Sequence, residues 1–154
     1  MAEVFFYHLT SSLLEQTLPQ LLERTLQNDW RVLVKSGDEG RLGWIDTQLW
    51  GGNSPQFLPH GISGGPYDAD QPVLLSSNGE NTNKAQAMML VYGAKTTPDE
   101  VAQYKRVSLI FNGNDDVSVQ DARHDWKLLT DAGIAAKYWS QETGRWQMKA
   151  EKNT

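Results

Sequence analysis

The chain of 154 residues contains no cysteine. This absence excludes disulfides, thiolate catalysis and cysteine zinc sites, and it agrees with a reducing compartment. The sequence also lacks any apolar run near the roughly 18 residues that a membrane span requires. Its N-terminus, MAEVFFYHLT, has no basic segment before the apolar stretch. A signal or transit peptide is therefore not predicted, and we expect a cytoplasmic location.

Positive charge is in deficit. There are 14 Lys and Arg against 19 Asp and Glu, which gives a formal net charge of -5. The average field of such a protein repels a polyanion, so direct binding to DNA is not expected. Contact with an acidic partner would need a local cluster of basic residues working against that background.

The motifs of nucleotide, metal and serine chemistry are missing as well. There is no GxxxxGK[ST], no GxGxxG after the first predicted strand and no GxSxG. The three histidines, His8, His60 and His124, have no metal-ligand spacing. We therefore predict no catalytic residue, no cofactor and no metal. An alternative reading, a degenerate nucleotide-binding hydrolase, would use the glycine-rich middle of the chain.

Short apolar segments alternate with amphipathic ones along the whole sequence. Strands are predicted at residues 4–8, 31–34, 72–77, 87–92, 107–111 and 135–139. Helices are predicted in the segment with leucines at 14, 18, 21 and 22, at 40–50, from Pro98, and at 119–132. The stretch between residues 51 and 72 is expected to be irregular. For the first helix, Ser12 and Glu15 match a capping box, whereas Pro19 favours a start near Thr17.

This alternation predicts an α/β fold in which an open, mostly parallel sheet carries helices on both faces, Rossmann-like but without a nucleotide motif. The apolar segments are continuous rather than alternating, as is typical of strands buried on both faces. We expect one domain over residues 1–154, with a tail that frays from about residue 148.

The segment DARHDWKLL places a tryptophan between two cations. Wound at about 100° per residue, it puts Leu128, Leu129 and Ala132 on the side facing the sheet. Trp126 then lies at the shoulder of that stripe, with Arg123 and Lys127 beside it on the open side. One interpretation is a helix edge whose cations pair with neighbouring aspartates. The other is a receptor for a peptide that ends in a hydrophobic side chain and a carboxylate, preceded by acidic residues.

At this point the sequence resembles the chi subunit family of bacterial DNA polymerase III. The likeness is carried, in order, by FFYHL, WRVLV, IDTQLW, QFLPHG, QPVLL, RVSLIFNGND, ARHDWK, TDAG and YWSQ. The resemblance implies an α/β fold related to nucleotide-binding domains and a connecting role in the clamp-loader assembly. It also implies that Arg123, Trp126 and Lys127 hold the acidic, phenylalanine-ended C-terminal tail of single-stranded DNA-binding protein. Relatives carry tyrosine at the position of Trp126, and some carry a basic residue at that of Val119.

The same resemblance implies a second partner surface. Trp50 and Phe57, near Pro59 and His60, match family residues that engage the psi subunit or a helicase. The alternative reading of these residues is that they lock the middle loop onto the sheet. DNA would then be reached only indirectly, through the coating protein, although stacking of single-stranded DNA on some of the six tryptophans is a further possibility.

Overall fold

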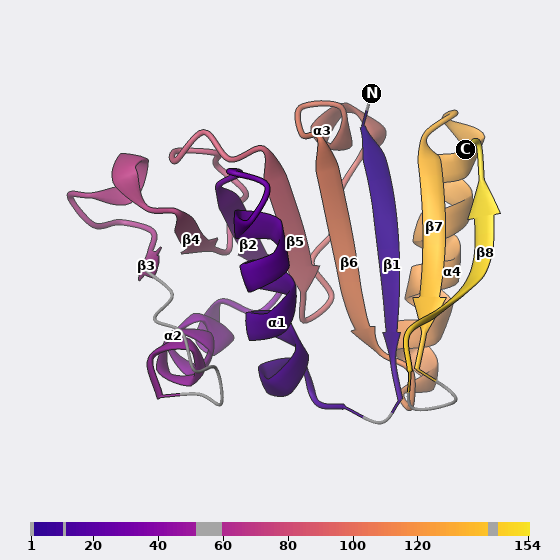
Figure 1. Cartoon of the computed structure of the whole chain (residues 1–154), viewed down its shortest axis with the longest axis horizontal. Helices are drawn as coiled ribbons and strands as arrows, with labels where there is room; N and C mark the ends of the chain where they lie inside the picture. Colours follow the sequence, from indigo (N-terminus) through magenta and orange to yellow (C-terminus); the bar gives the residue numbers. More distant parts are fainter. Residues whose placement is uncertain (1, 11, 52–59, 142–144) are drawn as a thin grey trace.

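A computed structural model of the chain describes residues 2–10, 12–51, 60–141 and 145–154, and in it one sheet runs through the molecule (Figure 1). The strands are β1 (Glu3–Leu9), β2 (Val32–Ser36), β3 (His60–Ile62), β4 (Val73–Ser76), β5 (Ala87–Val91), β6 (Arg106–Asn112), β7 (Ala135–Ser140) and β8 (Gln147–Lys152). The α-helices are α1 (Leu14–Leu26), α2 (Leu42–Gly51), α3 (Pro98–Val101) and α4 (Asp116–Asp131). Two short 3₁₀ turns, η1 (Glu39–Arg41) and η2 (Asp68–Asp70), complete the described elements.

The sheet has eight strands in the order β3-β4-β2-β5-β6-β1-β7-β8. Neighbouring strands are parallel from β3 to β7, and only β8 runs antiparallel to its neighbour. This arrangement confirms the predicted mostly parallel α/β fold. β1 lies between β6 and β7, so the chain leaves β1 toward one edge of the sheet and later returns past it toward the other.

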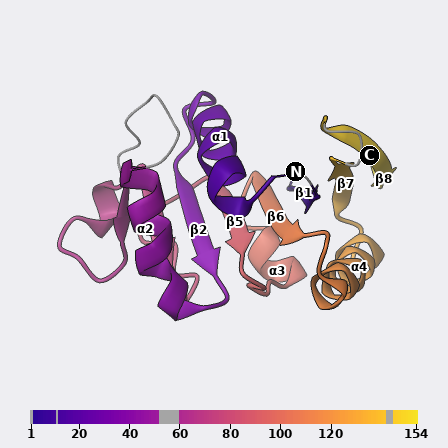
Figure 2. The ribbon, with the colours of Figure 1, turned by 90° about the horizontal axis from the view of Figure 1, so that it is seen from below.

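Each face of the sheet has its own hydrophobic core. Leucines of α1 and α2 pack with one set of strand residues, which includes Val34, Met89 and Ile110. Residues of α3 and α4 pack on the opposite face, with Phe6 and Met88 at the centre. Figure 2 shows α1 and α2 on one side of the sheet and α3 and α4 on the other. All residues of β4 and β5 are buried, as the continuous apolar runs predicted.

Helix α1 begins earlier than the position of Pro19 suggested. It starts at Leu14, and Gln16 Oε1 accepts a hydrogen bond from the Leu13 backbone N–H at 3.1 Å. This Leu13–Gln16 contact lies one residue after the predicted Ser12–Glu15 pair, which stays a prediction because the Glu15 side chain is outside the described atoms. Pro19 lies inside the helix, where the missing N–H removes one hydrogen bond. Burial of leucines on both sides of the proline, such as Leu18 and Leu22, offsets that loss.

The C-terminal segment forms a strand where fraying was expected from about residue 148. β8 pairs with β7, with an irregularity between Tyr138 and Trp139. All six of its residues are exposed, so the sequence contains no apolar pattern from which this strand could be predicted. Beyond it, the Asn153 side-chain amide donates hydrogen bonds to the carbonyls of Thr130 and Ile134. These bonds hold the end of the chain beside the end of α4.

Gly113 lets the start of the β6–α4 connection approach the end of β1. Its N–H donates to the Leu9 carbonyl at 2.6 Å, and a Cβ placed there would overlap the His8 imidazole. We expect Gly113→Ala to lower the free energy of unfolding by about 1–3 kcal/mol because neighbours must move. Gly43→Ala is the matched control, since a Cβ at this α2 position meets nothing within 4 Å. Equal urea midpoints for the two variants would contradict the prediction.

Candidate functional site

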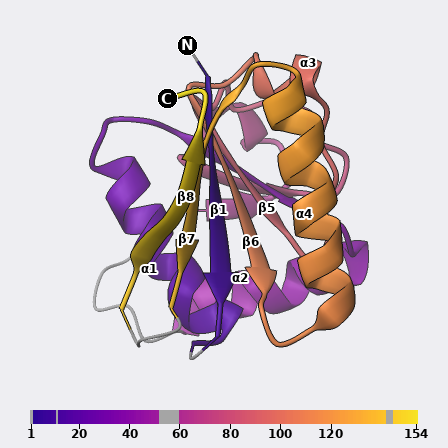
Figure 3. The same cartoon turned by 90° about the vertical axis from the view of Figure 1, so that its right-hand side faces the viewer.

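Helix α4 carries the predicted cluster and is positioned by its N-cap. The Asp115 carboxylate accepts from the Ser118 hydroxyl at 2.6 Å and from its backbone N–H at 3.2 Å. These hydrogen bonds lower the pKa of Asp115 below its ordinary value. The helix therefore begins at Asp116, three residues before the start inferred from the apolar pattern. Figure 3 shows it lying along one face of the sheet.

The inward side of α4 differs from the predicted one. Ala122, Leu129 and Thr130 are buried, whereas Leu128 is 44% exposed. Ala132, also predicted to face the sheet, is exposed. The buried stripe is rotated toward Trp126, because turning the indole inward buries more apolar area than turning Leu128 inward.

Trp126 is half-buried at the middle of this helix face. Its ring lies 5.3 Å from that of Phe6 and 6.0 Å from that of Tyr138, with edge-on geometry in both pairs. Tyr138 is itself held by a hydrogen bond of 2.6 Å between its hydroxyl and His8 Nδ1. The indole therefore has a packed aromatic support and one accessible side.

Arg123 and Lys127 are exposed one turn apart, next to Trp126 on the helix surface. Neither cation forms an ion pair within the described part of the chain. Asp121 and Asp125 lie on the other flank of the helix, 3.9 and 3.8 Å from the Lys95 ammonium. Asp131 lies one turn after Lys127 on the same flank, but the two described side chains form no ion pair. Helix α4 thus has one flank on which Asp121 and Asp125 pair with Lys95. On its other flank, Arg123 and Lys127 form no ion pair with a described residue.

Burial raises the pKa of Asp125 above 3.8, and the nearby Lys95 opposes this shift. Between the ordinary and the raised pKa, the native state holds the proton more tightly than the unfolded chain, so ionisation costs stability as pH rises. We expect Asp125→Asn to gain stability relative to the parent protein as pH increases from about 3 to 7. Urea midpoints at several pH values would measure this gain. Asp121→Asn makes the same charge change at an exposed position, and an identical profile for both variants would contradict the assignment.

The second predicted surface is only partly described. Trp50 belongs to α2, but its side chain is outside the described atoms, as are Phe57 and Pro59 entirely. His60 opens β3 and is buried, with Nε2 at 3.0 Å from the Asp46 carboxylate of α2. The histidine therefore links β3 to α2. The placement of Trp50, Phe57 and Pro59 relative to His60 lies outside the described part of the chain, so this surface stays a prediction.

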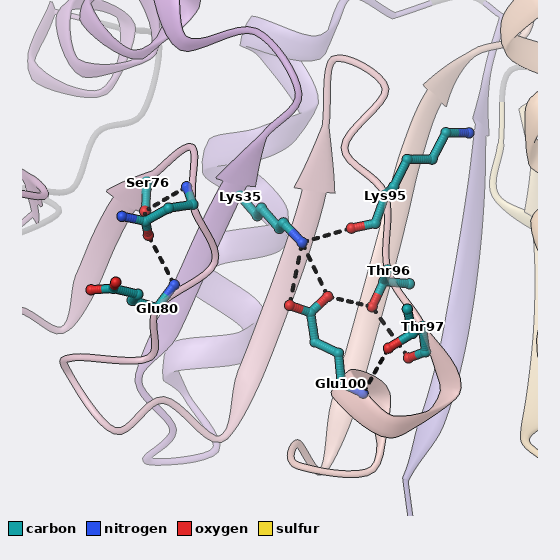
Figure 4. Close-up of polar contacts among 8 residues, drawn as sticks. Lys35, Ser76, Glu80, Lys95, Thr96, Thr97 and Glu100 are labelled. Carbon is teal, nitrogen blue, oxygen red and sulfur yellow. Dashed lines mark hydrogen bonds and ion pairs between the residues drawn. The ribbon is translucent and has the colours of Figure 1, made fainter.

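Sequence patterns did not reveal a polar cluster at the end of β2. The Lys35 ammonium lies 3.1 Å from Glu100 and donates to the Lys95 carbonyl at 2.7 Å, as Figure 4 shows. Glu100 also accepts from the Thr96 hydroxyl at 2.6 Å. Burial, with Glu100 adding a smaller effect, raises the pKa of nearby Tyr104 to about 12. These contacts hold the segment before α3 against the sheet. Lys35 and Glu100 therefore have a structural role here.

A cavity of about 500 Å³ lies at the carboxyl ends of β1, β5 and β6. Nucleotides bind at this place in many open α/β sheets. Here the wall includes the carboxylates of Asp121 and Asp125, which repel phosphate. Gly61, Gly64 and Gly65 of the middle segment are not among its lining residues. The cavity therefore does not favour the alternative nucleotide-binding hydrolase.

Across the described residues, no three His, Asp or Glu side chains are grouped closely enough to hold a metal ion. None of the described helices has the length and apolarity needed to cross a membrane.

Comparison with known proteins places the chain in a family. A family model described as "DNA polymerase III chi subunit, HolC" matches residues 1–137. The chain belongs to the DNA polymerase III chi subunit family. A similar protein is the "Probable DNA polymerase III subunit chi" of Rickettsia prowazekii (strain Madrid E), which is 22% identical over 107 residues. That match covers 70% of this chain and 62% of the relative. Membership of the chi family associates the chain with DNA replication.

Proposed function

We propose that this chi family member is a non-catalytic adaptor that joins the DNA polymerase III clamp loader to the acidic C-terminal tail of single-stranded DNA-binding protein. The tail would bind on α4, where Arg123, Trp126 and Lys127 lie side by side. The adaptor would act in the cytoplasm and contact DNA only through the coating protein at this site.

One observation supports the proposal most strongly: a half-buried indole next to two exposed cations that have no ion pair within the described part of the chain. The terminal phenylalanine of a tail can pack on the indole, and the cations can bind its carboxylates. Because Asp121 and Asp125 are engaged by Lys95 on the other flank, and Asp131 forms no ion pair with Lys127, the two cations remain available to an acidic ligand. Many tails along one coated strand would raise the effective concentration and make a weak contact durable.

For the second surface we propose contact with the psi subunit or a helicase through Trp50, Phe57, Pro59 and His60. The approach of His60 Nε2 to the Asp46 carboxylate at 3.0 Å would hold the start of β3 against α2, which carries Trp50. A pull-down with a Trp50→Ala variant tests this contact, and retention of both partners at parental levels would reject it.

A titration with a synthetic acidic peptide ending in phenylalanine tests the tail site. Arg123→Ala or Lys127→Ala is expected to weaken binding several-fold at low salt without unfolding the domain, because each removes one exposed charge contact. Amidation of the peptide's terminal carboxylate should weaken binding to the parent protein by a similar factor. Unchanged affinity for both variants and for the amidated peptide would reject the site.

The rival hydrolase has its own test. A nucleotide that binds only the native state raises the melting temperature. We expect no stabilisation by ATP or GTP, measured by thermal unfolding of the full chain. A clear rise in the melting temperature would favour the hydrolase.

A further inference from the structure

Half of one sheet face has no helix over it. On the side that carries α1, none of the described helices lies over β7 and β8, and α1 packs only beside β1, because α1 and α2 lie over the strands toward the other edge (Figure 2). Strand register places Phe5 beside Lys137 and Tyr7 beside Trp139 on this side. We call this surface the open face, and Trp146, just before β8, borders it.

Aromatic rings continue across the open face. Phe5 lies 6.3 Å from Tyr7 and 6.5 Å from Trp139, and Tyr7 lies 5.1 Å from Trp146. All four side chains are half-buried, so part of each remains accessible. The pairs meet edge-on, at 72°, 62° and 79°, so the rings face different directions and single bases can stack on individual rings.

Cations lie on these rings. The Arg106 guanidinium is 4.4 Å from the centre of Phe5 and 5.2 Å from that of Trp30, so it bridges the two rings. Lys137 lies over Phe5 and Lys105 over Trp30, at 5.8 and 5.9 Å. The cations therefore gather at the Phe5 and Trp30 end of the row of rings, where they are placed to meet the phosphates of a strand.

The charges on this face are largely available to an anion. Arg106 bonds Glu3 at 2.8 Å. Arg24, Lys105 and Lys137 form no ion pair with any residue in the described ranges. This is the local basic cluster that a polyanion would need on a protein whose net charge is -5.

A cavity of about 220 Å³ opens between these groups. Its walls include Tyr7, Trp139 and Trp146 together with Arg24 and Arg106. Aromatic walls and two guanidinium groups suit a planar base with its phosphate.

We propose that the open face binds single-stranded nucleic acid directly, with one base in the cavity and neighbouring phosphates on Arg24, Arg106 and Lys137. An acidic peptide is the competing occupant. It is less favoured because a single terminal ring would leave the row of rings from Trp30 to Trp146 unused. The proposal does not depend on tail binding at α4, which uses the opposite face of the sheet.

Fluorescence anisotropy with labelled oligothymidylate and the full chain at low salt tests the proposal. We expect Arg24→Gln with Lys137→Gln to weaken binding by roughly tenfold or more, because two phosphate contacts are lost. Arg123→Gln with Lys127→Gln makes the same charge change on α4 and should leave oligonucleotide binding nearly unchanged. The parent protein's tryptophan fluorescence should be quenched on binding. An oligonucleotide of abasic sites should bind roughly tenfold more weakly because it cannot stack.

Three results would overturn the proposal. The first is no binding of the oligonucleotide at low salt. The second is equal loss in the two double variants, or equal binding of the abasic strand, which would indicate only diffuse charge attraction. The third is loss of acidic-peptide binding in the Arg24 and Lys137 variant, which would make the open face a protein site. Because tail binding is measured on the same variants, its failure is distinguishable from failure of the open face.

Discussion

Reversing the charge at both Arg123 and Lys127 to glutamate is expected to weaken binding of an acidic, phenylalanine-ended peptide roughly a hundredfold, or about 2.7 kcal/mol. Removing two exposed charge contacts accounts for part of this loss. Repulsion between the new carboxylates and the peptide accounts for the rest. Isothermal titration at low salt would measure it, and the difference between parent and variant should shrink as salt rises.

A matched control distinguishes the effect of the α4 cluster from the effect of the protein's net charge. Arg41 and Lys84 are also exposed, and changing both to glutamate alters the net charge by the same amount. Peptide affinity should then fall only slightly, because neither residue lies on α4. A comparable loss in both double variants would mean that general electrostatics, and not the α4 cluster, governs binding. Trp126→Tyr should retain most of the affinity, since the ring remains.

Phe6→Ala should destabilise the fold by about 3–5 kcal/mol, a large share of the typical stability of a domain. Phe6 is fully buried in the centre of β1. Its ring stacks on Tyr138 at 6.3 Å and supports Trp126 at 5.3 Å. Truncation would leave a cavity under the α4 cluster, so both stability and tail binding should suffer.

Urea unfolding followed by circular dichroism would measure this loss. Val117→Ala, at a position of α4 that is 65% exposed, is the control and should stay within about 0.5 kcal/mol of the parent. A loss below about 1 kcal/mol for Phe6→Ala would show that the aromatic cluster repacks without it.

Patterns within a short stretch of sequence predicted the strands and helices that depend only on neighbouring residues. Continuous apolar residues identified β4 and β5, because burial on both faces leaves no polar alternation. The adjacency of Arg123, Trp126 and Lys127 follows from helix geometry alone. The start of α4 was placed too late because the apolar pattern begins after the Asp115 cap.

Features that depend on distant partners escaped prediction. β8 has no buried residue, so its sequence carries no apolar pattern that predicts a strand. Its pairing with β7 holds it in the sheet. The rotation of α4 depends on Phe6 and Tyr138, which lie 120 residues before and 12 residues after Trp126 in the numbering. The open face collects Arg24 from α1, Arg106 from β6 and Lys137 from β7, so no short motif contains it.

The place of β1 in the sheet has a consequence for biosynthesis. Four other described strands, β2 to β5, are made between this strand and its neighbours β6 and β7, with Glu3 aligned to Arg106 and to Ala135. Pairing across such long sequence separations is slow, because loop-closure entropy is paid before contacts form. The nascent apolar segment VFFY must therefore wait, unpaired, until most of the polypeptide has left the ribosome. During that interval it is the segment most in need of a chaperone.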